Sequence, residues 1–226
     1  MLGQFDTKHH WYLSDGGHSE NSGALSLLER GCDLIIVADN AQDEGYRFGD
    51  LEIFIRTART DIGIEVSVVK SENFPSHLML PPECFLNSGA TDWRIKITEA
   101  DNQAFALLLS ASDIPYREDG HWKRRREGQR WIIWLKPNRF QGLPADLATY
   151  ARLNPQFPQQ PTSNQFFDEA QWESYRRLGF EMGRRLFARR RTLSAFLPII
   201  YRKSRVSRDA QVGVEVRADT VSARSD

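Results

Sequence analysis

The stretch DLIIVAD, residues 33–39, decides the fold class of this chain. A continuous apolar run between two acids is typical of a strand that is buried on both faces of a parallel sheet. IEVSVV, residues 64–69, predicts a second strand, and residues 48–62 repeat apolar side chains at helical spacing between the two. This strand–helix–strand order indicates an α/β domain with crossover helices.

The residues upstream extend the same order. SENSGALSLLERG, residues 19–31, predicts a helix with Ser19 or Asn21 as its N-cap and Gly31 as its stop. A short apolar run over residues 10–14 predicts a first strand, which ends at Asp15. The chain therefore begins as strand, helix, strand, helix, strand, as though it entered in the middle of a sheet.

The residues downstream are less regular. WRIKIT, residues 93–98, alternates like a strand with one solvated face, and residues 121–137 predict a β-hairpin that turns at residues 127–129. Residues 145–153 and 166–187 predict two C-terminal helices, the second with a buried face that includes Trp172 and Leu178. We expect three parts: an α/β region over residues 1–185, a basic amphipathic segment over 186–203, and a disordered tail over 204–226.

Composition excludes several classes of protein. Of the 226 residues, 40% are hydrophobic and 27% are charged, which is typical of a globular domain. No apolar run approaches the ~20 residues of a membrane span, and the N-terminus lacks the regions of a secretory signal. Cys32 and Cys84 lack metal-ligand or redox spacing, so we expect two reduced, packed thiols and no metal or other cofactor. The expected location is the cytoplasm, including the periphery of the inner membrane.

Charge is unevenly distributed along the chain. The first 100 residues carry 8 Lys and Arg against 16 Asp and Glu, and the remaining residues carry 22 against 14. The basic residues are densest near the C-terminus, and two interpretations of this part of the chain remain open. It binds an anionic membrane surface, or it is a solvated helix at the edge of the domain. No nucleic-acid module accompanies it, so nucleic acid is not an expected partner. The membrane-surface candidates are Arg184, Arg185, Arg189, Arg190, Arg191, Arg202 and Lys203.

The first predicted strand ends in a group that is suited to chemistry. Asp15 is followed by Gly16 and Gly17, and reactive groups of α/β sheets gather at the carboxyl ends of strands. From these residues alone, Asp15 has three open roles: a general base, a metal ligand, or a cap of the following helix. Asp39, at the end of the next strand, is interpreted as part of the loop structure or as a supporting residue in the same crevice.

Several spaced blocks resemble the C-terminal part of the catalytic domain of bacterial patatin-like phospholipases. The first is YLSDGGHSENSGALSLLERGCDLIIVADNAQDEGYRFGDLEIFIRTARTDIGIEV, residues 12–66. The others are WIIWLKP, residues 131–137, and PQFPQQPTSNQFFDEAQWESYRRLG, residues 155–179. The resemblance covers roughly residues 10–185 and implies a partial patatin-like sheet with crossover helices, followed by a β-hairpin and C-terminal helices.

The resemblance also implies an activity. Patatin-like enzymes are acyl hydrolases with a Ser–Asp dyad and no metal, and Asp15 matches their catalytic aspartate. Gly16 and Gly17 would shape its turn, and His18, Glu20 and Asn21 continue the motif into the helix. The implied substrate is a phospholipid or another lipid acyl ester, cleaved through an acyl-serine intermediate.

The sequence departs from the family at the nucleophile. No G-x-S-x-G motif and no glycine-rich oxyanion loop occurs in the 226 residues. We therefore expect this chain to be inactive alone and to need an upstream, serine-bearing half. The alternatives are a non-catalytic α/β remnant, or a membrane- or partner-binding module that uses the basic C-terminal segment. A half-domain would also leave a sheet edge uncovered, which predicts self-association.

Overall fold

The computed structural model describes residues 20–88, 103–161 and 163–187. These residues form a mixed α/β fold around a four-stranded sheet with the strand order β1–β6–β3–β2. β1 is parallel to β6, whereas β3 is antiparallel to β6 and to β2, so the sheet is mixed and not purely parallel. The strands are β1 (Leu34–Ala38), β2 (Ile64–Val68), β3 (Ala106–Asp113) and β6 (Arg130–Leu135).

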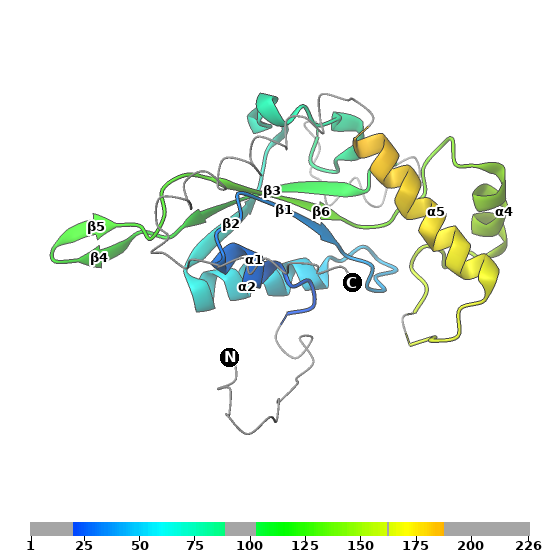
Figure 1. Cartoon of the computed structure of the whole chain (residues 1–226), viewed down its shortest axis with the longest axis horizontal. Coiled ribbons are helices and arrows are strands. Elements are labelled where there is room, and N and C mark those ends of the chain that lie inside the picture. Colours follow the sequence, from blue (N-terminus) through cyan, green and yellow to red (C-terminus); the bar gives the residue numbers. More distant parts are fainter. Residues whose placement is uncertain (1–19, 89–102, 162, 188–226) are drawn as a thin grey trace, which may run out of the picture.

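Two helices, α1 (Ala24–Glu29) and α2 (Gly49–Ile62), cover one face of this sheet (Figure 1). Phe54 of α2 packs on Trp134 of β6, with the ring centroids 5.5 Å apart. Both rings are fully buried, and burial of a large apolar side chain is worth ~1.5–3 kcal/mol, so such contacts hold the helices on the sheet.

The predicted strand–helix–strand unit over residues 33–69 is confirmed. α2 connects β1 to β2, which run in the same direction with β6 and β3 between them. α2 ends at Gly63, whose φ of 67° is the left-handed conformation that glycine adopts without strain, and the Gly63 amide donates to the Ala58 carbonyl. The glycine after the last apolar position of the helix was therefore a correct stop signal.

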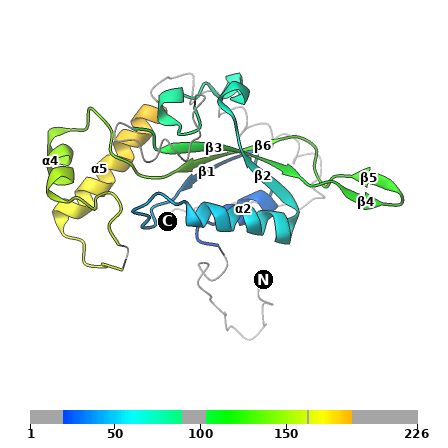
Figure 2. The same cartoon turned by 180° about the vertical axis from the view of Figure 1, so that it is seen from behind.

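Short 3-10 turns lie over the opposite face, and two further helices lie at one end of the sheet, as the view from behind shows (Figure 2). The turns are η2 (Ser71–Asn73), η3 (Ser76–Leu78) and η4 (Pro82–Cys84). The helices are α4 (Ala145–Leu153), whose predicted bounds are confirmed, and α5 (Glu169–Leu186). Side chains from both helices, including Leu147, Leu178 and Met182, share one buried cluster with Leu108 of β3.

The predicted hairpin over residues 121–137 is wrong in its pairing. β5 (His121–Lys123) pairs with β4 (Tyr116–Glu118), and the two form a separate ribbon that projects from the sheet (Figure 1). Asp119 and Gly120 both have positive φ, at 52° and 79°. This turn geometry suits the right-handed twist of a tight hairpin, so Asp-Gly was the stronger turn signal. β6 instead pairs with β1 and β3.

Burial of β1 and α5 also differs from the prediction. β1 is the outermost strand of the described sheet, and Ile36 on its α5 side is 45% exposed, so β1 is not buried on both faces. On α5, Leu178 is buried as expected, but Trp172 is exposed while Gln171 and Ser174 are buried. α5 packs against α4, and Nε2 of Gln171 donates to Oε1 of Gln160 at 3.3 Å, so these contacts, and not apolarity alone, decide which side of α5 is covered.

The start of α1 differs from its predicted cap. Gly23 occupies the cap position, and the Oγ of Ser22 accepts a hydrogen bond from the Ala24 amide at 3.1 Å. Asn21 therefore does not cap the helix. The predicted strands over residues 10–14 and 93–98, the proposed cap Ser19, the basic segment from residue 188 onward and the tail all lie outside the described residues.

Candidate functional site

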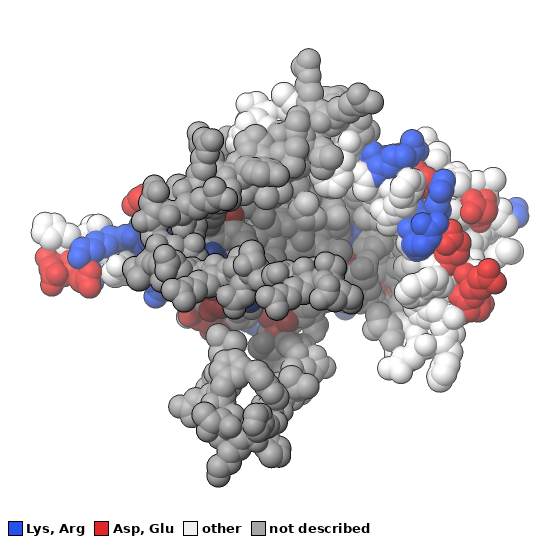
Figure 3. All heavy atoms as spheres, viewed as in Figure 1, with Lys and Arg blue, Asp and Glu red and all other residues white. Residues whose placement is uncertain are grey.

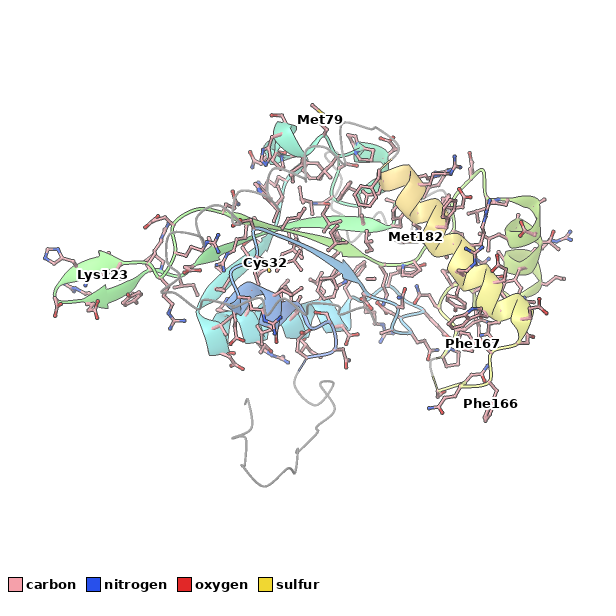
Figure 4. All side chains as sticks on the ribbon, viewed as in Figure 1. Cys32, Met79, Lys123, Phe166, Phe167 and Met182 are labelled. Atoms are coloured by element: carbon pink, nitrogen blue, oxygen red, sulfur yellow. The ribbon has the colours of Figure 1, made fainter. Side chains whose placement is uncertain are left out.

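An apolar cavity of about 440 Å³ lies at the carboxyl ends of the parallel strands β1 and β6. Ala38 and Leu135, the last residues of the two strands, contribute to its wall from the sheet, and α5 contributes the other wall. Met182 lies on the part of α5 nearest the sheet, and Phe167 precedes the helix (Figure 4). The cavity is within the range of small-molecule sites in proteins, ~300–1,000 Å³.

α5 is fixed over the cavity by its own sequence. Asp168 caps its first turn, with Oδ1 accepting from the Gln171 amide at 2.7 Å. Gly179 and Gly183 lie one turn apart and both line the cavity, and a Cβ built on either glycine would meet no atom within 4 Å. The missing side chains therefore create part of the hollow. The glycine pair was a sequence signal that this side of α5 is free of side chains, and the prediction of α5 did not use it.

The polar groups of the cavity wall are uncharged. They belong to Asn40, Gln160, Trp172 and Tyr175, and the Tyr175 hydroxyl accepts a hydrogen bond from the backbone amide of Gln160 at 3.2 Å. Burial raises the pKa of Tyr175 above its ordinary value, so its hydroxyl stays protonated at neutral pH. Within the described ranges, no Asp, Glu, His, Ser or Cys lines the cavity. This wall can hold an apolar group but does not itself supply a nucleophile or a base.

Asp39, the acid at the end of β1, forms a closed structural cluster beside the cavity. Its Oδ1 accepts from Nζ of Lys136 at 2.9 Å, and its Oδ2 accepts from Nε1 of Trp134 at 3.1 Å. The Lys136 ammonium also donates to the carbonyl of Ala41 at 2.8 Å, and the Asp39 and Lys136 side chains are each only 3% exposed. Both carboxylate oxygens are engaged, so Asp39 serves the loop structure, which was one of its two predicted roles.

Arginines close the opposite, amino edge of the sheet. Arg130 pairs with Asp113 and donates to the carbonyl of Leu28 at 3.2 Å, near the end of α1. Arg125 donates to the carbonyl of Ile62, the last residue of α2, at 2.9 Å. The carboxyl end of a helix favours a nearby cation, so these side chains stabilise α1 and α2.

The structure describes only part of the predicted catalytic motif. Asp15, Gly16, Gly17 and His18 lie outside the described residues. Glu20 Oε1 accepts from the Ser22 amide at 2.5 Å, as expected for a helix-entry residue. Asn21 instead donates from Nδ2 to Oδ1 of Asp50 at 3.0 Å, which ties the start of α1 to the first turn of α2.

The membrane-surface candidates are also only partly described. Arg184 is exposed and pairs with Glu181 at 2.8 Å. Arg185 lies over the Phe140 ring, 4.0 Å from its centroid, and donates to the carbonyl of Gln141. Arg185 therefore packs α5 against the loop after β6, while the remaining candidates, Arg189 to Lys203, are not described.

Comparisons with protein-family models, with curated proteins and with solved structures each gave no match to this chain. No helix in the described part of the chain is long and apolar enough to cross a membrane. The same residues contain no group of three His, Cys, Asp or Glu side chains placed to hold a metal ion.

Proposed function

We propose that this chain is the Asp-bearing C-terminal part of a patatin-like lipid acyl hydrolase, and that the acyl group lies in the cavity under α5. The observation that carries the proposal is the position of this cavity at the carboxyl ends of β1 and β6. Ligands of α/β sheets bind outside these strand ends, because the loops there form a crevice. Its apolar wall suits the hydrocarbon part of a lipid ester.

The chain connection supports Asp15 as the base at this edge. Asn21 binds Asp50 in the first turn of α2, so the chain enters α1 from the side of the sheet where β1 ends. Asp15 precedes Glu20 by five positions, and an extended chain covers at most ~18 Å over that length. The described chain thus starts at the edge that carries the cavity, and this connection supports Asp15 as the proposed base.

The proposed reaction needs a serine from an upstream half. Serine Oγ attacks the ester carbonyl carbon, while the Asp15 carboxylate takes the hydroxyl proton and returns it to the departing alkoxide. Water then attacks the acyl-serine with Asp15 again as base, which releases the fatty acid and restores the serine. In this scheme the cavity aligns the acyl chain, which lowers the entropic part of the barrier.

A second candidate is a non-catalytic domain that binds a lipid acyl group. It is favoured by one observation: the described cavity wall contains only uncharged polar groups. The two candidates share the apolar ligand and differ in hydrolysis, so they are separated by two measurements.

The first measurement is binding of a soluble fluorescent fatty acid to the full chain. Gly179→Phe should fill the cavity and weaken binding by about tenfold or more, the effect of losing ~1.4 kcal/mol. Ala148→Phe adds the same ring to the exposed side of α4 and should leave binding unchanged. Equal binding by the wild type and by both variants would contradict the proposed acyl site.

The second measurement is hydrolysis of a chromogenic acyl ester. We expect no turnover by the chain alone, and turnover when the serine-bearing half of a patatin-like enzyme is added. Asp15→Asn should abolish that turnover and leave fatty-acid binding intact. Binding without turnover in the mixture would favour the non-catalytic candidate, and turnover that survives Asp15→Asn would remove the assigned base.

A further inference from the structure

We propose that the outer side of α5, together with Phe166, docks on a lipid surface from which an apolar chain passes into the cavity. This inference rests on the function proposed above, because it names the physical state in which the substrate is presented. It concerns the rim of the cavity and is separate from the basic segment that follows α5 in the sequence.

Three aromatic side chains mark this surface, which we call the aromatic rim: Phe166, Trp172 and Phe180. They are 92%, 66% and 54% exposed. Trp172 and Phe180 are two helical turns apart on the same side of α5, and Figure 4 shows Phe166 at the outer end of the loop before the helix. Trp172 and Phe180 are about 12 Å apart along the helix axis, and large exposed apolar surfaces mark interaction sites.

The rim is continuous with the cavity. Trp172 is two-thirds exposed and also lines the cavity, and Phe167, next to Phe166 in the chain, lines it as well. An apolar molecule that leaves a lipid surface at the rim would therefore stay in contact with apolar atoms until it reached the interior. A protein partner seated on the rim would cover this entrance.

Charged side chains of α5 are paired with one another, including the buried Glu181. Arg176 pairs with Glu173 at 2.6 Å, and Glu181 pairs with Arg177 and Arg184. The guanidinium of Arg177 also lies 5.3 Å from the centroid of the Phe180 ring. Basic and acidic side chains accordingly lie side by side over this end of the molecule (Figure 3).

This charge balance favours a lipid surface over a nucleic acid. Nucleic-acid binding depends on an excess of basic groups that displace counterions from phosphates. Aromatic side chains instead partition into the interface between lipid headgroups and acyl chains without a net charge. We therefore expect binding to zwitterionic vesicles, with weak dependence on salt.

The ribbon provides a matched control. Trp122 of β5 is 72% exposed, which is similar to Trp172, but it lies on the ribbon at the opposite end of the molecule from α5 (Figure 1). The cavity lining does not include Trp122. If exposure alone drove vesicle binding, the two regions would contribute equally.

The test is co-sedimentation of the full chain with phosphatidylcholine vesicles. The double variant Phe166→Ala/Phe180→Ala should bind about tenfold more weakly, because two aromatic anchors are lost. Trp122→Ala should bind like the wild type. Neither residue of the double variant lines the cavity, so its binding of the soluble fluorescent fatty acid should not change.

Three results would overturn this inference: vesicle binding unchanged in the double variant, an equal loss in Trp122→Ala, or binding only to anionic vesicles. Size-exclusion chromatography tests whether a second copy of the chain covers the aromatic rim instead. The inference would also be overturned if the wild type formed an oligomer that did not bind vesicles, and if the double variant were a monomer. Failure of the proposed function is recognised separately, because it appears as absent binding of the soluble fatty acid.

Discussion

The face of the sheet under α1 and α2 has a buried ion pair at each end of β6, and we call it the closed face. The face under α5 has a cavity at the carboxyl ends of the strands, and we call it the open face. On the closed face, Arg130 and Lys136 stand at the two ends of β6 with Ile132 and Trp134 between them, and each cation pairs with a buried acid. On the open face, Leu135 stands at the same carboxyl edge and lines the cavity. Charged pairs thus seal one side of a strand whose other side is available to a ligand.

The difference arises from the alternation of a single strand. Successive side chains of a strand point to opposite faces, so the order Leu135, Lys136 places an apolar residue on one face and a cation on the other. Lys136 on the closed face finds Asp39 at the end of β1. The open face has the glycines of α5 at the same level, and these leave space.

The largest expected effect is on the closed face, from Lys136→Met. This variant leaves the buried Asp39 carboxylate without its cation, and loss of one partner of a buried pair costs about 3–5 kcal/mol of unfolding free energy. Lys123→Met breaks an exposed pair with Glu118 on the ribbon and should cost less than about 1 kcal/mol. Urea unfolding measures both, and similar losses would show that the carboxyl edge is not sealed by this pair.

Two leucine truncations compare the packing of the faces. Leu109 on the closed face and Leu178 beside the cavity are both fully buried. Leucine-to-alanine changes in protein cores cost about 2–5 kcal/mol, and the cost is larger where the removed methyl groups were closely packed. We expect Leu109→Ala near the top of this range and Leu178→Ala near the bottom, since Leu178 already borders a hollow. Calorimetric melting checks this order, and the reverse order would mean that the cavity is filled in solution.

The smallest effect, and one of opposite sign, is expected at a glycine of the open face. Gly179→Ala places a methyl group where no atom lies within 4 Å and raises helix propensity, so it should stabilise the protein by about 0.5–1 kcal/mol. Gly63→Ala is the contrast: its φ of 67° makes a side chain strained, and it should destabilise by about 1–2 kcal/mol. Thermal melting compares them, and destabilisation by Gly179→Ala would indicate that α5 is packed more tightly here.

Local sequence patterns predicted β1, α2 and α4. An apolar run predicted β1, helical spacing and Gly63 predicted α2, and the bounds of α4 are as expected. These signals depend on neighbouring residues, so they can be detected without knowledge of the tertiary fold. The α/β class followed from the same stretch of sequence.

What the sequence could not show was which distant residues meet. The pairing of β6 with β1 and β3 depends on contacts between residues that are far apart in the sequence, and so does the exposure of Trp172. The catalytic assignment of Asp15 came from the patatin-like resemblance and stays a prediction, as does self-association of an uncovered sheet edge. The cavity needed α5 to be placed over Ala38 and Leu135, which no local pattern specifies.

The two buried ion pairs of the closed face also imply an order of assembly. Arg130 and Asp113 are 17 positions apart, whereas Lys136 and Asp39 are 97 positions apart. Closing the longer loop costs about 1.5 kcal/mol more in chain entropy. The β3–β6 hairpin can therefore form early, and β1 with α1 joins it late. Under mildly destabilising conditions, the backbone amides of β1 should exchange with solvent before those of β3.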